Sequence, residues 1–203
     1  MLLPPSYLIS LSGSKRTSVE LEHLASRGVF PQIYYGFDGA KLGLETKFPY
    51  EVDNPGSGYK IDGKHIGLCL SHFGLWRGLL ASLGQAFTVL EDDAEFPEVW
   101  EADFDSAFES LPADWDLFYF GSCCCSGRVL SQVYGNLFKV AYPLCTHAYC
   151  VRKRALKELI ETQERIFAPI DLSMMLQTLN LHRLNVYAYL PRLVSQRDTV
   201  LVP

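Results

Sequence analysis

Three carboxylates in a row follow an apolar, β-prone run, and this pattern is able to hold a cation. Residues 87–90 read Phe-Thr-Val-Leu, and Glu91, Asp92 and Asp93 come directly after them. On an extended backbone Glu91 and Asp93 point to one side and Asp92 points to the other. Two carboxylates on one side form half of the oxygen shell of a hard divalent cation, with positions left for phosphate oxygens. Such a cation would neutralise a diphosphate as it leaves. The tripeptide alone favours a simpler interpretation, a solvated acidic turn.

The rest of the chain predicts the frame that would hold this acidic group. Strand patterns lie at residues 6–13, 30–39, 87–90, 115–121, 140–151 and 184–191. Helix patterns lie at residues 18–28, 67–83, 98–111, 153–166 and 169–180, and a Gly- and Pro-containing loop at 41–64. Because alternating strands and helices build βαβ units, we expect one α/β domain over residues 1–203 with a mostly parallel central sheet. Ligands of such sheets bind outside the carboxyl ends of the strands, which is where the three acids lie.

Composition argues against several classes of protein. The net charge of −5 disfavours a nucleic-acid binder that relies on phosphate neutralisation. Pro4-Pro5 interrupts an amino terminus without a cationic region, so we expect no signal peptide, and no apolar window reaches the length of a transmembrane segment. The six cysteines, three of them consecutive at 123–125, form no Cys-x-x-Cys pair. We therefore expect no zinc site, and reduced thiols in a cytoplasmic protein that is free or peripheral to the membrane.

Several short motifs resemble glycosyltransferase family 25 in their order and spacing. This family contains lipooligosaccharide galactosyltransferases of bacteria and the collagen β-galactosyltransferase domain. The motifs are YLISL at 7–11, FDG at 37–39, IGLCLSHFGLW at 66–76, LEDDAEF at 90–96, DWDLFYFG at 114–121, THAYCVRKRALKELI at 146–160, APID at 168–171 and PRLVSQ at 191–196. They extend over nearly the whole chain. The resemblance implies a GT-A-type fold, which is a Rossmann-like α/β sandwich.

The resemblance also implies an activity and assigns residues to it. The family transfers a hexose, usually galactose, with inversion from a UDP-sugar to a hydroxyl group, here of a glycan or protein-linked acceptor. Residues 91–93 become an Asp-x-Asp-like motif, with Asp93 as the leading ligand of Mn²⁺ (or Mg²⁺) and Glu91 as the second. The positions implied to contact the donor and substrates are Ser10, Leu11, Lys15, Arg16, Asp38, Gly39, Ser71, His72, Glu91, Asp92 and His147.

Several of these positions have a simpler interpretation from the residues alone. Asp38 can belong to a turn instead of contacting uridine or ribose. Lys15 and Arg16 can be exposed basic residues that meet no diphosphate. A lone histidine such as His72 or His147 is more often a core or surface residue than a functional one.

An inverting transfer needs a general base that takes the proton of the acceptor hydroxyl. Asp171, which the resemblance places on the acceptor side, is the candidate, with Asp116 and Asp92 as alternatives. Asp171 can also be a first-turn acid that the helix dipole stabilises. Two other functions stay open: a non-catalytic nucleotide-sugar-binding relative, and a metal-dependent phosphohydrolase, which would need further metal ligands.

Overall fold

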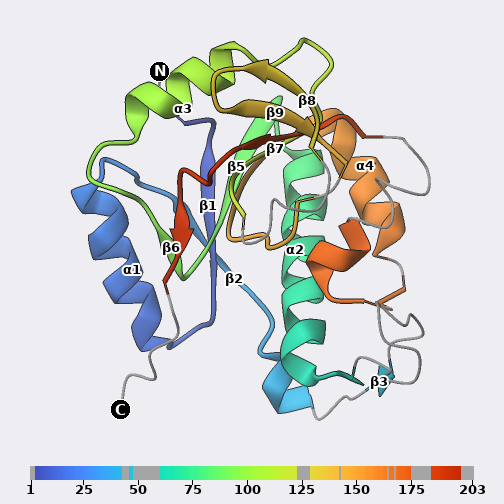
Figure 1. Cartoon of the computed structure of the whole chain (residues 1–203). Helices are drawn as coiled ribbons and strands as arrows, with labels where there is room; N and C mark the ends of the chain where they lie inside the picture. The colour runs from blue at the N-terminus through green and yellow to red at the C-terminus, as the bar shows by residue number, and fades with distance from the viewer. Residues whose placement is uncertain are drawn as a thin grey trace.

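An eight-stranded sheet forms the centre of the molecule in a computed structural model (Figure 1). The structure describes residues 3–42, 46–47, 60–122, 129–141, 143–163, 165–166, 168–174 and 184–197. The strands of this sheet are β1 (Ser6–Ser10), β2 (Gln32–Tyr35), β5 (Ala86–Glu91), β7 (Leu117–Gly121), β8 (Val129–Tyr134), β9 (Leu137–Val140), β10 (Ala148–Arg152) and β11 (Val186–Tyr189). They lie side by side in the order β2-β1-β5-β10-β7-β11-β9-β8.

Most strands of the sheet run in the same direction. Strand β1 is parallel to β2 and β5, and β7 is parallel to β11. Strand β10 runs antiparallel between β5 and β7, and β9 runs antiparallel between β11 and β8. Only β9 and β10 therefore oppose the other strands of this sheet, which confirms the prediction of an α/β protein with a mostly parallel central sheet.

Helices cover both faces of the sheet. They are α1 (Lys15–Ser26), α2 (Gly63–Ala81), α3 (Glu101–Glu109) and α4 (Lys153–Thr162). Helices α1 and α3 pack on one face with Leu8 and Leu90, whereas α2 and α4 pack on the other with Ile9 and Val89. Neighbouring strand residues thus enter opposite cores, as strand geometry requires. The result is a layered α/β/α sandwich whose central strands are buried on both sides.

The register of the sheet brings distant segments to one edge. Ile9 of β1 pairs with Glu91 of β5, so the carboxyl ends of these parallel strands meet. Because β10 is antiparallel to β5, its first residue, Ala148, pairs with Leu90. The residues that precede β10 therefore lie beside the three acids, although 55 residues separate Glu91 from Thr146.

The boundaries of several predicted elements differ from the structure, and two of these differences bear on the site. Helix α2 begins at Gly63, four residues before the prediction, because the Asp62 side chain caps it by accepting a hydrogen bond from the backbone N–H of His65 at 3.0 Å. Residues 140–151, which predict one or two strands, contain the end of β9 and most of β10, and the described residues between them belong to no strand.

Two other predicted segments are described only in part. Part of the predicted loop 41–64 is the 3₁₀ turn η1 (Gly39–Leu42) and the paired short strands β3 (Thr46–Lys47) and β4 (Lys60–Ile61). The predicted helix at 169–180 is helical over residues 170–174. Residues 43–45 and 48–59 of the loop and residues 175–180 of the helix lie outside the described residues.

The cysteines correct one expectation. Cys69 and Cys150 are buried free thiols, but Cys145 is disulfide-bonded. Residues 123–125 lie outside the described residues. Stable disulfides are rare in reducing compartments. The prediction that all the thiols are reduced is therefore wrong at Cys145.

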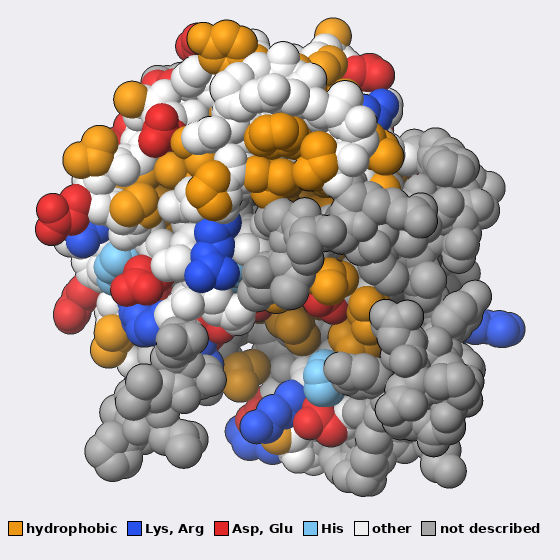
Figure 2. All heavy atoms as spheres, viewed as in Figure 1, with side chains coloured by type: hydrophobic (Ala, Val, Ile, Leu, Met, Phe, Trp, Pro, Cys, Tyr) orange, Lys and Arg blue, Asp and Glu red, His pale blue; other side chains and the backbone are white. Residues whose placement is uncertain are grey.

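Strand β8 exposes several apolar side chains at the surface. Hydrophobic side chains gather in the upper part of Figure 2, where Figure 1 places β8 and β9. The exposed residues of β8 include Val129, Leu130, Val133 and Tyr134. Among the described helices, none has the length and apolarity needed to cross a membrane.

Candidate functional site

The three acids and several of the other predicted site residues lie at the carboxyl ends of β1 and β5. Glu91 is the last residue of β5, and Asp92 and Asp93 form the turn into β6 (Ala94–Glu95). Strand β6 pairs with β12 (Ser195–Gln196), so a C-terminal segment lies against this turn. Figure 2 shows a hollow below the carboxyl ends of β1 and β5, with charged and histidine side chains around it. Another hollow, of about 360 Å³, lies at the opposite edge of the sheet, and no predicted site residue lines it.

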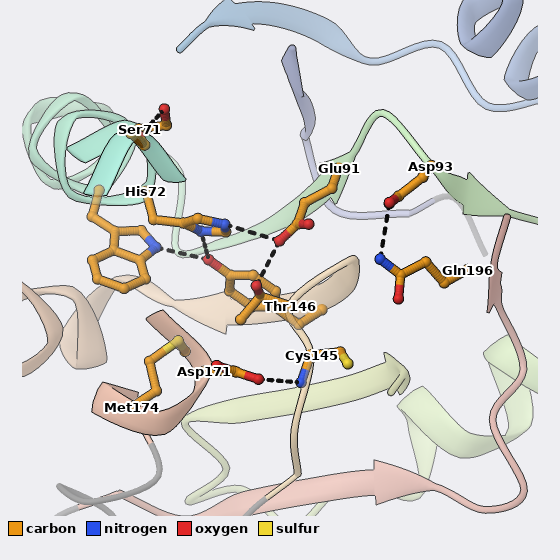
Figure 3. Close-up of polar contacts among 12 residues, drawn as sticks. Ser71, His72, Glu91, Asp93, Cys145, Thr146, Asp171, Met174 and Gln196 are labelled. Carbon is orange, nitrogen blue, oxygen red and sulfur yellow. Dashed lines mark hydrogen bonds and ion pairs between the residues drawn. The ribbon is translucent and has the colours of Figure 1, made fainter. Parts of the chain in front are cut away.

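Glu91 is held by two donors on the same oxygen (Figure 3). Its Oε1 accepts a hydrogen bond from Thr146 Oγ1 at 2.5 Å and lies 3.2 Å from His72 Nε2. Burial opposes the charge of this side chain, but these two contacts hold the pKa of Glu91 below its ordinary value. No described residue donates a hydrogen bond to Oε2. The side chain, 14% exposed, can present that oxygen to a ligand.

Asp92 and Asp93 face a different set of partners. Ser10 Oγ donates a hydrogen bond to Asp92 Oδ2 at 2.9 Å, and Arg16 Nη2 lies 3.1 Å from Asp92 Oδ1 and 3.5 Å from Asp93 Oδ2. Gln196 Nε2 donates a hydrogen bond to Asp93 Oδ2 at 2.9 Å. The alternation of a strand ends at Glu91, so the turn, and not strand geometry, directs the Asp93 carboxylate toward Gln196.

The second oxygen of Asp93, Oδ1, is buried. Among the described residues, no group donates a hydrogen bond to Asp93 Oδ1. Burial and then the nearby charge of Glu91 raise the pKa of Asp93, because both disfavour its ionised form. Arg16 opposes these effects in part. The turn therefore carries more negative charge than the described residues neutralise.

The carboxylate oxygens of Glu91 and Asp93 fit a hard divalent cation, but they supply only part of its coordination shell. An unpaired carboxylate oxygen of Asp93 beside a second carboxylate, Glu91, is the kind of oxygen ligand that Mn²⁺ and Mg²⁺ prefer. Within the described part of the chain, no three His, Cys, Asp or Glu side chains converge on one metal position. Phosphate oxygens and water would have to complete the coordination.

The predicted donor contacts at Asp38 and Gly39 lie in a turn packed tightly on α2. A Cβ atom on Gly39 would lie 1.7 Å from the carbonyl oxygen of Gly63, so the two backbones can approach only because both residues are glycine. Ser71, 2% exposed, accepts a hydrogen bond from the backbone N–H of Phe37 at 2.9 Å and thereby fixes this turn. Lys41 Nζ lies 2.8 Å from Asp38 and lowers the pKa of its carboxyl group.

The remaining predicted contacts differ in accessibility. Leu11 and Lys15 are exposed beside the start of α1. His147 is fully buried, and its Nε2 lies 3.2 Å from the carbonyl oxygen of Val194. Burial lowers the pKa of His147, which indicates a neutral imidazole. In this structure His147 lies beneath the surface of the site.

Asp171 reaches the site through the segment that precedes β10. Its Oδ2 accepts a hydrogen bond from the backbone N–H of Cys145 at 3.1 Å, and Thr146, the next residue, contacts Glu91. Cys145 has a φ of 67°, in the left-handed region that side chains rarely adopt. Asp116, by contrast, precedes β7 at the opposite edge of the sheet and forms an ion pair with Arg154, which removes it as a candidate base.

The sequence did not single out several residues that support the site. Thr146 and Tyr149 lie within a recognised motif, but nothing in the pattern marks their contacts. Glu20 of α1 is fully buried and lies 3.2 Å from Arg197 Nη2. Its spacing of four residues from buried Leu24 could have predicted an inward position. Arg197 could not be predicted, because it reaches Glu20 only when the C-terminal segment packs beside the acidic turn.

Comparisons with known proteins agree with the resemblance seen in the motifs. The model for glycosyltransferase family 25 (LPS biosynthesis protein) matches residues 3–174. A curated relative from Homo sapiens, inactive glycosyltransferase 25 family member 3, is 27% identical over 136 residues, which are 64% of this chain and 22% of that protein. The chain thus spans about a fifth of the length of this relative.

Two solved structures are similar to this chain. The crystal structure of A197 from STIV has a TM-score of 0.51 and 10% identity, and the match covers 95% of this chain and 83% of that one. A glycosyltransferase involved in the glycosylation of the major capsid of PBCV-1 has a TM-score of 0.45 and 14% identity, with 95% and 93% covered. The sheet and its covering helices are those of a GT-A-like α/β fold, as predicted. Because the family model covers most of its length, the chain belongs to glycosyltransferase family 25.

Proposed function

We propose that this chain is an inverting hexosyltransferase that moves a sugar, galactose in the first instance, from a UDP-sugar to a hydroxyl group of a glycan or glycoconjugate. One observation carries the proposal. The acidic turn at residues 91–93, the cationic Arg16 and the carboxylate of Asp171 are all held at one edge of the sheet. A UDP-sugar needs positive charge at its diphosphate, and an attacking hydroxyl needs a base.

The donor would bind between the acidic turn and the glycine-packed turn of Asp38. Asp93 and Glu91 would hold Mn²⁺ or Mg²⁺, which supplies positive charge to the diphosphate. Arg16 is 47% exposed and already reaches both aspartates, so it can turn toward phosphate oxygens without a change in the backbone. Asp38, at the end of the neighbouring turn, would accept a hydrogen bond from the ribose or the uracil.

The acceptor would bind near Asp171. Inversion requires the hydroxyl to attack from the side opposite UDP while a base removes its proton. Both Asp171 oxygens already accept a backbone N–H, from Cys145 at 3.1 Å and from Leu172 at 2.8 Å. These bonds orient the carboxylate, and each oxygen retains a lone pair for the acceptor hydroxyl.

A non-catalytic nucleotide-sugar-binding protein is the second candidate. The human relative carries the word inactive in its name, and Arg16 already neutralises part of the acidic turn. A metal-dependent phosphohydrolase has less support, because no three His, Cys, Asp or Glu side chains of the described residues converge on one metal position.

The experiment measures UDP release from a panel of UDP-sugars with Mn²⁺, with Mg²⁺ and with EDTA. Asp93→Asn should abolish metal-dependent release, whereas Glu98→Gln, at an exposed position after β6, should not change it. If no UDP is released but calorimetry shows that UDP binds, the non-catalytic candidate is favoured. The absence of both release and binding would refute the proposal, and phosphate release from a simple ester would favour the hydrolase.

A further inference from the structure

A chain of three buried side chains ends on Glu91 (Figure 3). Trp76 Nε1 donates a hydrogen bond to the Tyr149 hydroxyl at 2.8 Å, and that hydroxyl lies 3.0 Å from His72 Nδ1. His72 Nε2 in turn lies 3.2 Å from Glu91 Oε1. Trp76, Tyr149 and His72 are each 0% exposed, so water does not replace any of these contacts.

Among the described residues, only one position of the ring proton of His72 satisfies every hydrogen-bonding atom of this chain. The indole of Trp76 can only donate, so the Tyr149 oxygen accepts and its own proton must go to His72 Nδ1. A proton on Nδ1 would leave the Tyr149 hydroxyl without an acceptor among the described residues. An unprotonated Nε2 would direct its lone pair toward the negative Glu91 carboxylate, and the two would repel each other. The hydrogen-bond geometry therefore assigns the ring proton of His72 to Nε2.

This tautomer determines which oxygen of Glu91 is available. His72 and Thr146 both donate to Oε1, and no described residue donates to Oε2. A carboxylate held by two donors on one oxygen cannot rotate without losing both. Oε2 is therefore the oxygen that remains for a cation or a ligand. Hydrogen-bond partners behind a ligating side chain commonly set its orientation in this way.

We propose that Tyr149 and Trp76 are positioning residues for the transfer reaction: they fix the Nε2–H tautomer of His72, which orients Glu91 so that Oε2 faces the donor. This inference rests on the proposed function, because it gives Glu91 a role in donor binding. It also makes a claim about His72 alone, which can be tested without turnover.

The test compares two tyrosines that differ in their contact with His72. Tyr149→Phe removes the hydroxyl that orients His72. Tyr119→Phe is the matched control: Tyr119 is 2% exposed, its ring stacks on Tyr149 with centroids 5.5 Å apart, and its hydroxyl contacts the Met174 sulfur at 3.6 Å. The ¹⁵N spectrum of the ring nitrogens reports the tautomer, and the signals that disappear in His72→Gln identify His72. UDP release reports the effect on the site.

A double-mutant cycle separates positioning from a structural role. The glutamine side chain of the His72→Gln variant has no ring nitrogen for Tyr149 to orient, so Tyr149→Phe should have little further effect in that background. We expect Tyr149→Phe to lower metal-dependent UDP release by about tenfold or more in the wild-type background. In the His72→Gln background, and for Tyr119→Phe, we expect a change of less than about twofold.

The spectra should show one neutral tautomer with the proton on Nε2 in the wild type and a mixture in Tyr149→Phe. A proton on Nδ1, or a doubly protonated ring, would overturn the inference, as would an equal loss from Tyr149→Phe in both backgrounds. If the wild type neither releases nor binds UDP, the proposed function fails. In that case the spectra alone would test this inference, because they report the tautomer of His72 and its dependence on Tyr149.

Discussion

Glu20 is a buried acid whose protonation should control part of the pH dependence of stability. It is 0% exposed on α1, Arg197 Nη2 lies 3.2 Å away, and neither carboxylate oxygen has a well-formed hydrogen bond within the described residues. Burial raises the pKa of Glu20 from its ordinary 4.5 to about 7, against the opposing charge of Arg197. Folding therefore favours the protonated form.

The sign and size of the effect follow from this shift. The folded protein holds the proton more tightly than the unfolded chain, so the contribution of Glu20 is fully present below pH 4.5 and is lost as the pH rises through about 7. A shift of this size corresponds to about 3 kcal/mol, since each pKa unit is worth roughly 1.4 kcal/mol. Glu20→Gln cannot ionise, so the wild type should lose about 3 kcal/mol relative to this variant over that pH range.

Urea unfolding of the wild type and Glu20→Gln, from pH 4.5 to above pH 7, measures this difference. Glu22→Gln is the matched control, because Glu22 lies on the same helix but is exposed. Its stability difference from the wild type should not vary with pH over the range. A difference between the wild type and Glu20→Gln that stays constant within about 0.5 kcal/mol would refute the reasoning.

Three further predictions concern other contacts of the site. Thr146→Val should lower the free energy of unfolding near pH 7 by about 1.5–3 kcal/mol, because the buried carboxylate of Glu91 loses a hydrogen-bond donor. Thr146→Ser keeps a hydroxyl donor and should retain most of the stability. Urea unfolding measures both variants, and equal losses of stability would contradict the assignment. Gly67→Ala should lower the free energy of unfolding by about 1–3 kcal/mol, because the new Cβ atom would lie 2.6 Å from a backbone carbonyl oxygen. Gly78→Ala in the same helix meets nothing within 4 Å and should raise the free energy of unfolding by roughly 0.5–1 kcal/mol. Thermal unfolding that ranks the two variants in the opposite order would disprove the close approach at Gly67. Arg16→Gln should change the free energy of unfolding by less than about 1 kcal/mol, since the ion pair between Arg16 and Asp92 is partly exposed. The same variant should weaken UDP binding about tenfold in calorimetry. Unchanged UDP affinity would exclude contact between Arg16 and the diphosphate.

The sequence predicted the fold class because periodicity and turn residues mark each element locally. It could not predict that β10 is antiparallel, since an apolar run such as residues 148–151 looks the same in either direction. That direction is what places Thr146 beside Glu91. The acidic turn was found because three adjacent charges after a strand are unusual, and it lies where strand order predicts.

The supporting residues were harder to predict, because their roles depend on partners far away in sequence. Glu20 looks like an ordinary helical acid until Arg197 is placed against it. Tyr149 looks like a core aromatic until Trp76 and His72 determine the direction of its hydrogen bond. For Cys145, three consecutive cysteines argued against a disulfide framework, and only the folded chain shows that it is bonded.

The contacts of the acidic turn span long stretches of the chain, and this has a consequence for folding. Ser10 and Asp92 are 82 residues apart, Thr146 and Glu91 are 55 apart, and Gln196 and Asp93 are 103 apart. Loop closure on this scale is slow compared with helix formation. During refolding, helical signal should therefore return before UDP binding does. An intermediate that contains the helices and the parallel β1–β5 pair would carry the acids of the turn, but Gln196, Thr146 and Arg197 would not yet orient them. Ligand binding would therefore report only completely folded molecules.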